Sequence, residues 1–163
     1  MRKSILVFAC CCLIMVGCSK KEYVQDENLA IDISGKFIKA IMTNQYQEAY
    51  DAYLSPGIKF GPKATLDYFK ADWDAIIDKY GQLNKATFDG WQTVSGKRAL
   101  QVYYLVKHEN VEEPVNYHFV LEGYKKTGYT IFLIDIGNEQ KYPPHLATAP
   151  EIQKKEEIIE ILP

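Results

Sequence analysis

The stretch Leu66–Val94, LDYFKADWDAIIDKYGQLNKATFDGWQTV, changes its hydrophobic period in the middle, and this change decides the fold. Before Gly81 the apolar residues recur every three or four positions, as on one face of an amphipathic helix: Leu66, Phe69, Trp73, Ile76, Ile77 and Tyr80. Gly81 stands where a helix C-terminal cap belongs. From Leu83 the period is two, which indicates a strand. The stretch therefore predicts a helix followed by the first strand of a sheet.

Two more helices are expected upstream. Residues 30–43 place Ala30, Ile33, Phe37, Ala40 and Ile41 on one stripe, and a shorter helix with the same kind of stripe runs from Tyr46 to Leu54. Ser55-Pro56-Gly57 ends it, because proline cannot continue the hydrogen-bond ladder. Pro62 suits the first turn of the third helix.

Three further strands are expected downstream of Val94. Together with Leu83–Val94 they are Lys97–His108, Val115–Tyr124 and Tyr129–Ile136. The connections Ser95-Gly96, Glu109–Pro114 and Lys125–Gly128 are short, which predicts an antiparallel meander. Helices first and antiparallel strands afterwards indicate an α+β fold.

The order of these motifs resembles the nuclear transport factor 2-like superfamily. The resemblance rests on the run Phe37–Pro56, FIKAIMTNQYQEAYDAYLSP, on Trp73, on Tyr80-Gly81 and on the four strands, and it covers residues 29–137. It implies N-terminal helices packed on a curved four-stranded antiparallel sheet, a cone with a pocket inside, and often a dimer through the sheet's outer face. The superfamily holds isomerases, cyclases, dehydratases and non-catalytic binders, so it indicates the fold rather than an activity.

A two-residue turn at Ser95-Gly96 would pair Val94 with Lys97 and Phe88 with Tyr103. On this register one sheet face is apolar enough to meet the helices and line a pocket. Together with two helical residues, the expected pocket-lining side chains are Phe37, Trp73, Phe88, Tyr103, Tyr117 and Phe119.

The other face is also expected to be apolar, and therefore to be covered. Its expected interface residues are Trp91, Leu100, Val102, Tyr104, Val120 and Leu133. Three covers remain open at this point: a second copy of the chain, a different envelope protein, and the C-terminal tail.

The chemistry-bearing residues give a weak pattern. Tyr104, His118 and Asp135 are expected in one row across three strands, and such a set can serve acid–base catalysis. The same row on an outer face is also ordinary sheet stabilisation. The carboxylate and oxyanion-hole set of the superfamily's isomerases has no match here. The three histidines are scattered, so neither a metal nor a cofactor is expected.

The chain begins with a targeting signal. Arg2 and Lys3 precede the apolar run Ile5–Val16, which is too short to span a membrane. Met15-Val16-Gly17-Cys18 resembles the lipobox of a bacterial lipoprotein, which implies cleavage after residue 17 and lipidation of Cys18. All four cysteines lie within residues 1–18, so a mature chain would have no disulfide of its own. Ser19 favours the periplasmic side of the outer membrane, or the outer face of the cell membrane in a cell with one membrane.

The expected organisation is thus a signal peptide (1–17), a lipidated cysteine with a tether (18–28), the α+β domain (29–137), and a proline-rich linker with a short amphipathic segment (138–163). A net charge of −2, mixed along the chain, gives no indication of nucleic-acid binding. The leading expectation is a non-catalytic, lipid-anchored envelope domain that binds a small apolar ligand or an envelope protein. An isomerase- or hydrolase-type enzyme and a structural dimerisation module are the alternatives.

Overall fold

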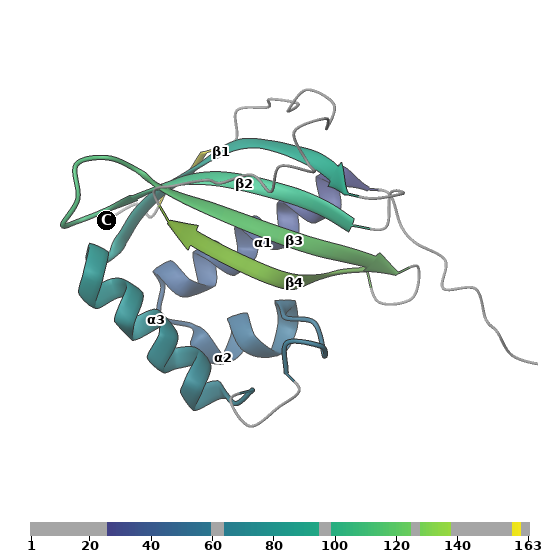
Figure 1. The fold of residues 1–163 in the computed structure, drawn as a ribbon, viewed down its shortest axis with the longest axis horizontal. Helices are drawn as coiled ribbons and strands as arrows, with labels where there is room; N and C mark the ends of the chain where they lie inside the picture. Colours follow the sequence, from purple (N-terminus) through teal and green to yellow (C-terminus); the bar gives the residue numbers. More distant parts are fainter. Residues whose placement is uncertain (1–25, 60–63, 95–98, 125–127, 138–157, 161–163) are drawn as a thin grey trace, which may run out of the picture.

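The computed structural model describes residues 26–59, 64–94, 99–124, 128–137 and 158–160. In these ranges helices lie against one face of an antiparallel sheet, so the expected α+β class is confirmed (Figure 1). The helical elements are α1 (Glu27–Met42), α2 (Tyr46–Glu48), the π-helical η1 (Ala49–Tyr53) and α3 (Leu66–Tyr80). The strands are β1 (Leu83–Val94), β2 (Ala99–His108), β3 (Val115–Tyr124), β4 (Gly128–Gly137) and β5 (Ile158–Glu160), in the spatial order β4-β3-β2-β1-β5.

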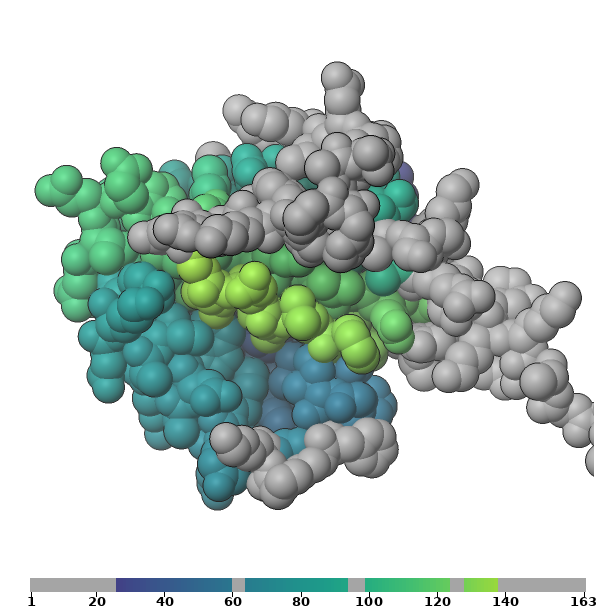
Figure 2. All heavy atoms as spheres, viewed as in Figure 1, coloured from purple at the N-terminus to yellow at the C-terminus, as the bar shows by residue number. Residues whose placement is uncertain are grey.

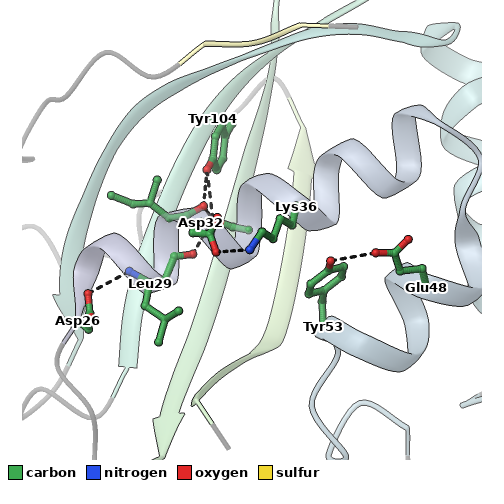
Figure 3. A network of polar contacts seen from close by, with 10 residues as sticks. Asp26, Leu29, Asp32, Lys36, Glu48, Tyr53 and Tyr104 are labelled. Atoms are coloured by element: carbon green, nitrogen blue, oxygen red, sulfur yellow. Dashed lines mark hydrogen bonds and ion pairs between the residues drawn. The ribbon is translucent and has the colours of Figure 1, made fainter.

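Helix α1 is the central element of the helical layer. The Asp26 side chain caps it by accepting a hydrogen bond of 3.0 Å from the Leu29 amide, and an exposed Lys36–Asp32 ion pair of 2.7 Å lies one turn along (Figure 3). Its opposite side is buried against the sheet, where the Tyr104 hydroxyl donates to the Ile31 carbonyl at 3.1 Å (Figure 3). This bond ties β2 directly to α1.

The second expected helix, Tyr46–Leu54, is divided into α2 and the π-helical η1. The chain leaves η1 at Leu54, which forms a parallel bridge with Ile131 of β4, and the Ser55 amide donates to the Ile131 carbonyl at 2.8 Å. This contact covers part of the free edge of β4, because β4 is the last strand of the sheet.

Helix α3 begins later than Pro62, which lies outside the described residues. Thr65 is its N-cap and accepts a hydrogen bond from the Tyr68 amide at 3.3 Å. The helix ends at Gly81, whose φ of +87° and ψ of 177° suit only glycine. The Gly81 amide donates to the Ile77 carbonyl at 2.7 Å, so the expected C-terminal cap is present.

The predicted register of β2 is wrong. Val94 pairs with Ala99 rather than Lys97, and Asp89 is an extra residue between Phe88 and Gly90, so Phe88 lies opposite Tyr104. The next hairpin aligns Tyr104 with Tyr117, not with His118. Side chains alternate between the two faces, so a shift of one residue moves every β2 side chain to the other face.

Several residues therefore lie on the opposite face of the sheet from the one predicted. Tyr103, expected in the pocket, lies on the outer face, which is the sheet face opposite the helices and carries Gln92, Gln101, Tyr103, His118, Val120 and Asp135. Four expected interface residues lie instead on the helix side: Trp91, Leu100, Val102 and Tyr104. Val120 and Leu133 pair with each other, and Val120 is opposite Gln101 as part of the outer face.

Aromatic side chains fill the space between helices and sheet. Phe37 of α1 is at the centre, with ring centroids 5.9 Å from Trp73 and 5.8 Å from Phe119. Phe88 and Tyr104 continue the cluster toward β1, with ring centroids 5.7 Å apart. Phe37, Phe88, Tyr117 and Phe119 are at most 4% exposed, so these expected pocket-lining residues form the core itself.

Candidate functional site: a groove between α3 and β4

A groove of about 640 Å³ separates α3 from β4, where the helix diverges from the edge of the sheet. Figure 2 shows the surface hollowed below β4, between α3 and the η1 region. The walls are mostly apolar, and the lining residues are Leu54, Ile58, Phe69, Asp72, Trp73, Ala75, Ile76, Lys79, Tyr80, Phe132, Leu133, Ile134 and Ile136. The volume lies in the range of small-molecule sites.

The strand wall owes its shape to an irregularity in β4. Register shifts there, since Val120 pairs with Leu133 while Leu121 pairs with Ile131, and Phe132 is the extra residue. Phe132 and Leu133 are 48% and 44% exposed, which is unusual for such large apolar side chains. They place apolar surface at the mouth of the groove, where a ligand would shield it from water.

The helix wall presents one stripe of α3. Trp73 is its buried floor and also contacts Phe37, so the groove reaches the aromatic core. Asp72 and Lys79 are the charged lining residues, and two helical turns separate them, about 10 Å along the axis. Lys79 Nζ lies 4.6 Å from the centre of the Tyr80 ring.

A second polar feature is buried beside the groove, where sequence reasoning missed it. His108 is 1% exposed, and its Nδ1 hydrogen-bonds the Gly81 carbonyl at 2.8 Å while its Nε2 bonds the Tyr117 hydroxyl at 3.1 Å. Burial lowers the pKa of His108, partly opposed by the bond to Gly81, and burial raises the pKa of Tyr117. Both ring nitrogens are engaged, which suits a structural histidine better than a catalytic one.

The expected Tyr104–His118–Asp135 row is not assembled. His118 does lie opposite Asp135, but Tyr103 is its neighbour on β2, and the Tyr103 and His118 rings stack at 4.9 Å. Burial lowers the pKa of His118, while the Asp135 charge opposes the shift. Tyr104 is on the other side of the sheet, bonded to Ile31 and Ser34 of α1.

Within the described ranges, no three histidine, cysteine or acidic side chains are grouped so that they could hold a metal ion. In the same ranges no helix has the length and apolar character needed to cross a membrane. Cys18 lies outside the described residues.

Comparisons of the chain with protein-family models, with curated proteins and with solved structures find no match.

Ile58 and Phe132 are groove residues that the periodicity did not single out. Ile58 follows the Ser55-Pro56-Gly57 break, and only the tertiary fold brings it beside β4. Phe132 is the extra residue at the β4 irregularity, and it is exposed at the mouth of the groove.

Proposed function

We propose that this protein is a non-catalytic binding domain that takes a small apolar ligand into the groove between α3 and β4. The observation that carries the proposal is the exposed apolar mouth, Phe132 and Leu133, above a floor made by Trp73 and Phe69. Burying this surface under a ligand gains roughly 25 cal/mol per Å² of apolar area.

Catalysis is the weaker alternative. The titratable groups of the lining are Asp72, Lys79 and Tyr80, and the two carrying opposite charges lie two turns apart rather than converging. His108 is engaged through both nitrogens, and His118 belongs to the outer face. A general acid or base must lie within hydrogen-bond reach of the reacting atom, and the described lining residues of the groove include no converging pair of this kind.

The proposal also includes the superfamily, the lipid anchor and the cellular location expected from the sequence. The α+β arrangement supports assignment to the nuclear transport factor 2-like superfamily, and the Met15–Cys18 motif supports a lipid anchor at Cys18. On this proposal the domain resides on the periplasmic side of an outer membrane, or on the outer face of a single cell membrane.

Trp73 reports on groove occupancy. In residues 19–163 carrying Trp91→Phe, Trp73 is the only tryptophan. We expect a bromine-labelled long-chain fatty acid to quench its fluorescence as the groove fills, because bromine quenches only at short range. Phe132→Ser should weaken binding by about tenfold, equivalent to ~1.4 kcal/mol.

Tyr68→Ser is the matched control. Tyr68 is 49% exposed and belongs to α3 but does not line the groove, so the affinity should not change. Absence of quenching, or equal loss in both variants, would exclude the groove as the binding site. A dimer that takes up no probe would instead favour the structural role.

A further inference from the structure

The groove between α3 and β4 has two ends of different character. At one end the Tyr80 ring of α3 stands 5.5 Å from the His108 ring, and His108 bonds the Tyr117 hydroxyl. Tyr117 pairs in turn with Ile136 of β4. The C-terminal end of α3 therefore lies beside the C-terminal end of β4 (Figure 1). Lys79, Tyr80 and Ile136 line the groove at this end.

The opposite end of the groove is apolar. Leu54 forms its bridge with Ile131, the residue directly before Phe132 in β4. The Phe69 ring, near the start of α3, lies 5.6 Å from the Tyr50 ring of η1. The groove residues gathered at this end carry no charge: Leu54, Ile58, Phe69 and Phe132.

The two walls give the groove the length of a medium alkyl chain. From Phe69 to Lys79 helix α3 rises about 15 Å, at ~1.5 Å for each of ten residues. From Phe132 to Ile136 strand β4 advances about 13 Å, at ~3.3 Å for each of four residues. An extended alkyl chain advances about 1.3 Å per carbon, given C–C bonds of ~1.5 Å. The groove therefore suits a straight chain of roughly ten to twelve carbons.

Lys79 provides a positive charge at one end of this length. Its Nζ lies 4.6 Å from the centre of the Tyr80 ring, and in the described part of the chain no carboxylate lies within ion-pair distance of it. Lys70, on α3 but outside the groove lining, is instead paired with Asp74 at 3.5 Å. The ammonium group of Lys79 is thus available to a negative group on a ligand.

Asp72 is less well placed to select the charge of a ligand. It lies partway along α3, with the lining residues Phe69 on one side and Ile76 on the other. A charged head group at Asp72 would leave apolar lining uncovered in one direction or the other. A head group at Lys79 lets the whole chain run toward Phe132.

The end of α3 favours a head group with a single negative charge. A helix C-terminus carries partial negative charge, which opposes a nearby anion. Two of the last carbonyl groups are already bonded, because Ile77 accepts from the Gly81 amide at 2.7 Å and Tyr80 accepts from the Asn110 amide at 3.0 Å. The remaining field penalises a doubly charged phosphate more than a carboxylate.

We propose that the groove selects a straight-chain carboxylate of roughly ten to twelve carbons, with the carboxylate at Lys79 and the chain end beside Leu54 and Phe132. This assignment rests on the proposed function, because it names the class of ligand for the same groove. It adds a preference that an apolar groove alone does not have: the acid binds more tightly than a neutral molecule of the same length.

Two bromine-labelled probes test this preference. They are ω-bromododecanoate and ω-bromododecanol, titrated at neutral pH, where the carboxylate is ionised. The protein is the Trp91→Phe chain of residues 19–163, in which Trp73 reports binding. Both probes should quench Trp73, and the acid should bind about fivefold more tightly, near the upper limit for an exposed ion pair. Added salt should reduce this ratio.

Variants of two lysines on α3 locate the charge that is recognised. Lys79→Gln should bring the ratio of the two affinities to about one, and Lys79→Arg should keep it, because the charge is retained. Lys70→Gln is the matched control and should keep the ratio of the parent chain. Binding of the alcohol shows in each case that the variant is folded.

The outcomes separate this inference from the proposed function. Equal affinities for acid and alcohol in the parent chain, or a ratio that Lys79→Gln leaves unchanged, would overturn the carboxylate assignment while the groove remained an apolar site. Quenching by neither probe would overturn the proposed function and the carboxylate assignment together.

Discussion

At the residue scale, His108 shows how a polar group is retained in an aromatic core. It stands between the Tyr80 and Tyr117 rings, with centroids 5.5 Å and 5.8 Å from its own, and it joins the end of α3 to β3 through its two hydrogen bonds. These bonds are made by the neutral ring. Protonation would place a charge where water cannot solvate it.

This burial predicts a pH-dependent stability. The pKa of His108 in the folded chain is below its unfolded value of about 6.5, and that of His118 is shifted in the same direction. Below that pH the unfolded chain binds more protons, so the free energy of unfolding should fall as the pH falls from 7 to 5. The loss is at most about 1.4 kcal/mol per pH unit for each histidine.

Urea denaturation of residues 19–163 at several pH values measures this slope. His108→Gln keeps hydrogen-bonding groups without the titration, so its slope should be smaller than that of the parent chain, and His118→Gln should reduce it as well. A free energy of unfolding that rises between pH 7 and pH 5 would contradict the prediction.

At the element scale, a substitution at Gly81 tests the end of α3, and Gly128 at the start of β4 serves as the comparison. Both have positive φ, +87° at Gly81 and +68° at Gly128. A Cβ at Gly81 would lie 2.8 Å from Asn110 Cγ and from the Asn110 amide nitrogen, whereas no described atom lies within 4 Å of a Cβ at Gly128. Gly128→Ala should therefore cost about 1 kcal/mol for the left-handed backbone alone.

Gly81→Ala should cost about 3 kcal/mol, because backbone strain and the clash with Asn110 act together. The free energies of unfolding of the two variants, measured side by side, check this. If both variants lost the same free energy of unfolding, Asn110 would have to move aside, and its close contact with Gly81 would not be what fixes the connection between α3 and β1.

The strands show what could be predicted at this scale. The ends of β1 and β3 agree with the sequence expectation, because alternation and turn residues mark them. The sheet face on which each β2 side chain lies could not be obtained from the assumed turn, because the bulge at Asp89 exchanges the two faces. Gly90 was the available signal, because glycine inside a strand often marks a bulge.

At the scale of the whole molecule, the prediction concerns the anchor. If Cys18 is lipidated, bacteria that express the full chain with radioactive palmitate should yield a labelled protein in the membrane fraction, because two or more acyl chains anchor a protein stably. Cys18→Ser should abolish the label, whereas Cys12→Ser, a cysteine within the expected signal peptide, should retain it. Label on the Cys18→Ser chain would place the lipid at another residue.

The distribution of apolar residues over the sheet bears on where a partner would bind. The expected apolar outer face would have favoured a dimer, but Leu100, Val102 and Tyr104 are buried on the helix side, and the outer face holds the Gln92–Gln101–Tyr103–His118 cluster instead. The exposed apolar surface is displaced to Phe132 and Leu133 at the edge of the sheet. Binding is therefore expected at the groove rather than across the sheet.

The sequence by itself determined the order of helices and strands, the α+β class, and the stop at Gly81, because periodicity, capping and turn chemistry act over a few residues. Only the tertiary structure decided which face each β2 residue takes, because one bulged residue reverses the phase without altering the period. It also brought Ile58 and Phe132 beside α3 and joined His108 to the Gly81 carbonyl at the end of α3. These contacts join residues far apart in the chain, and such pairings depend on how the layers pack.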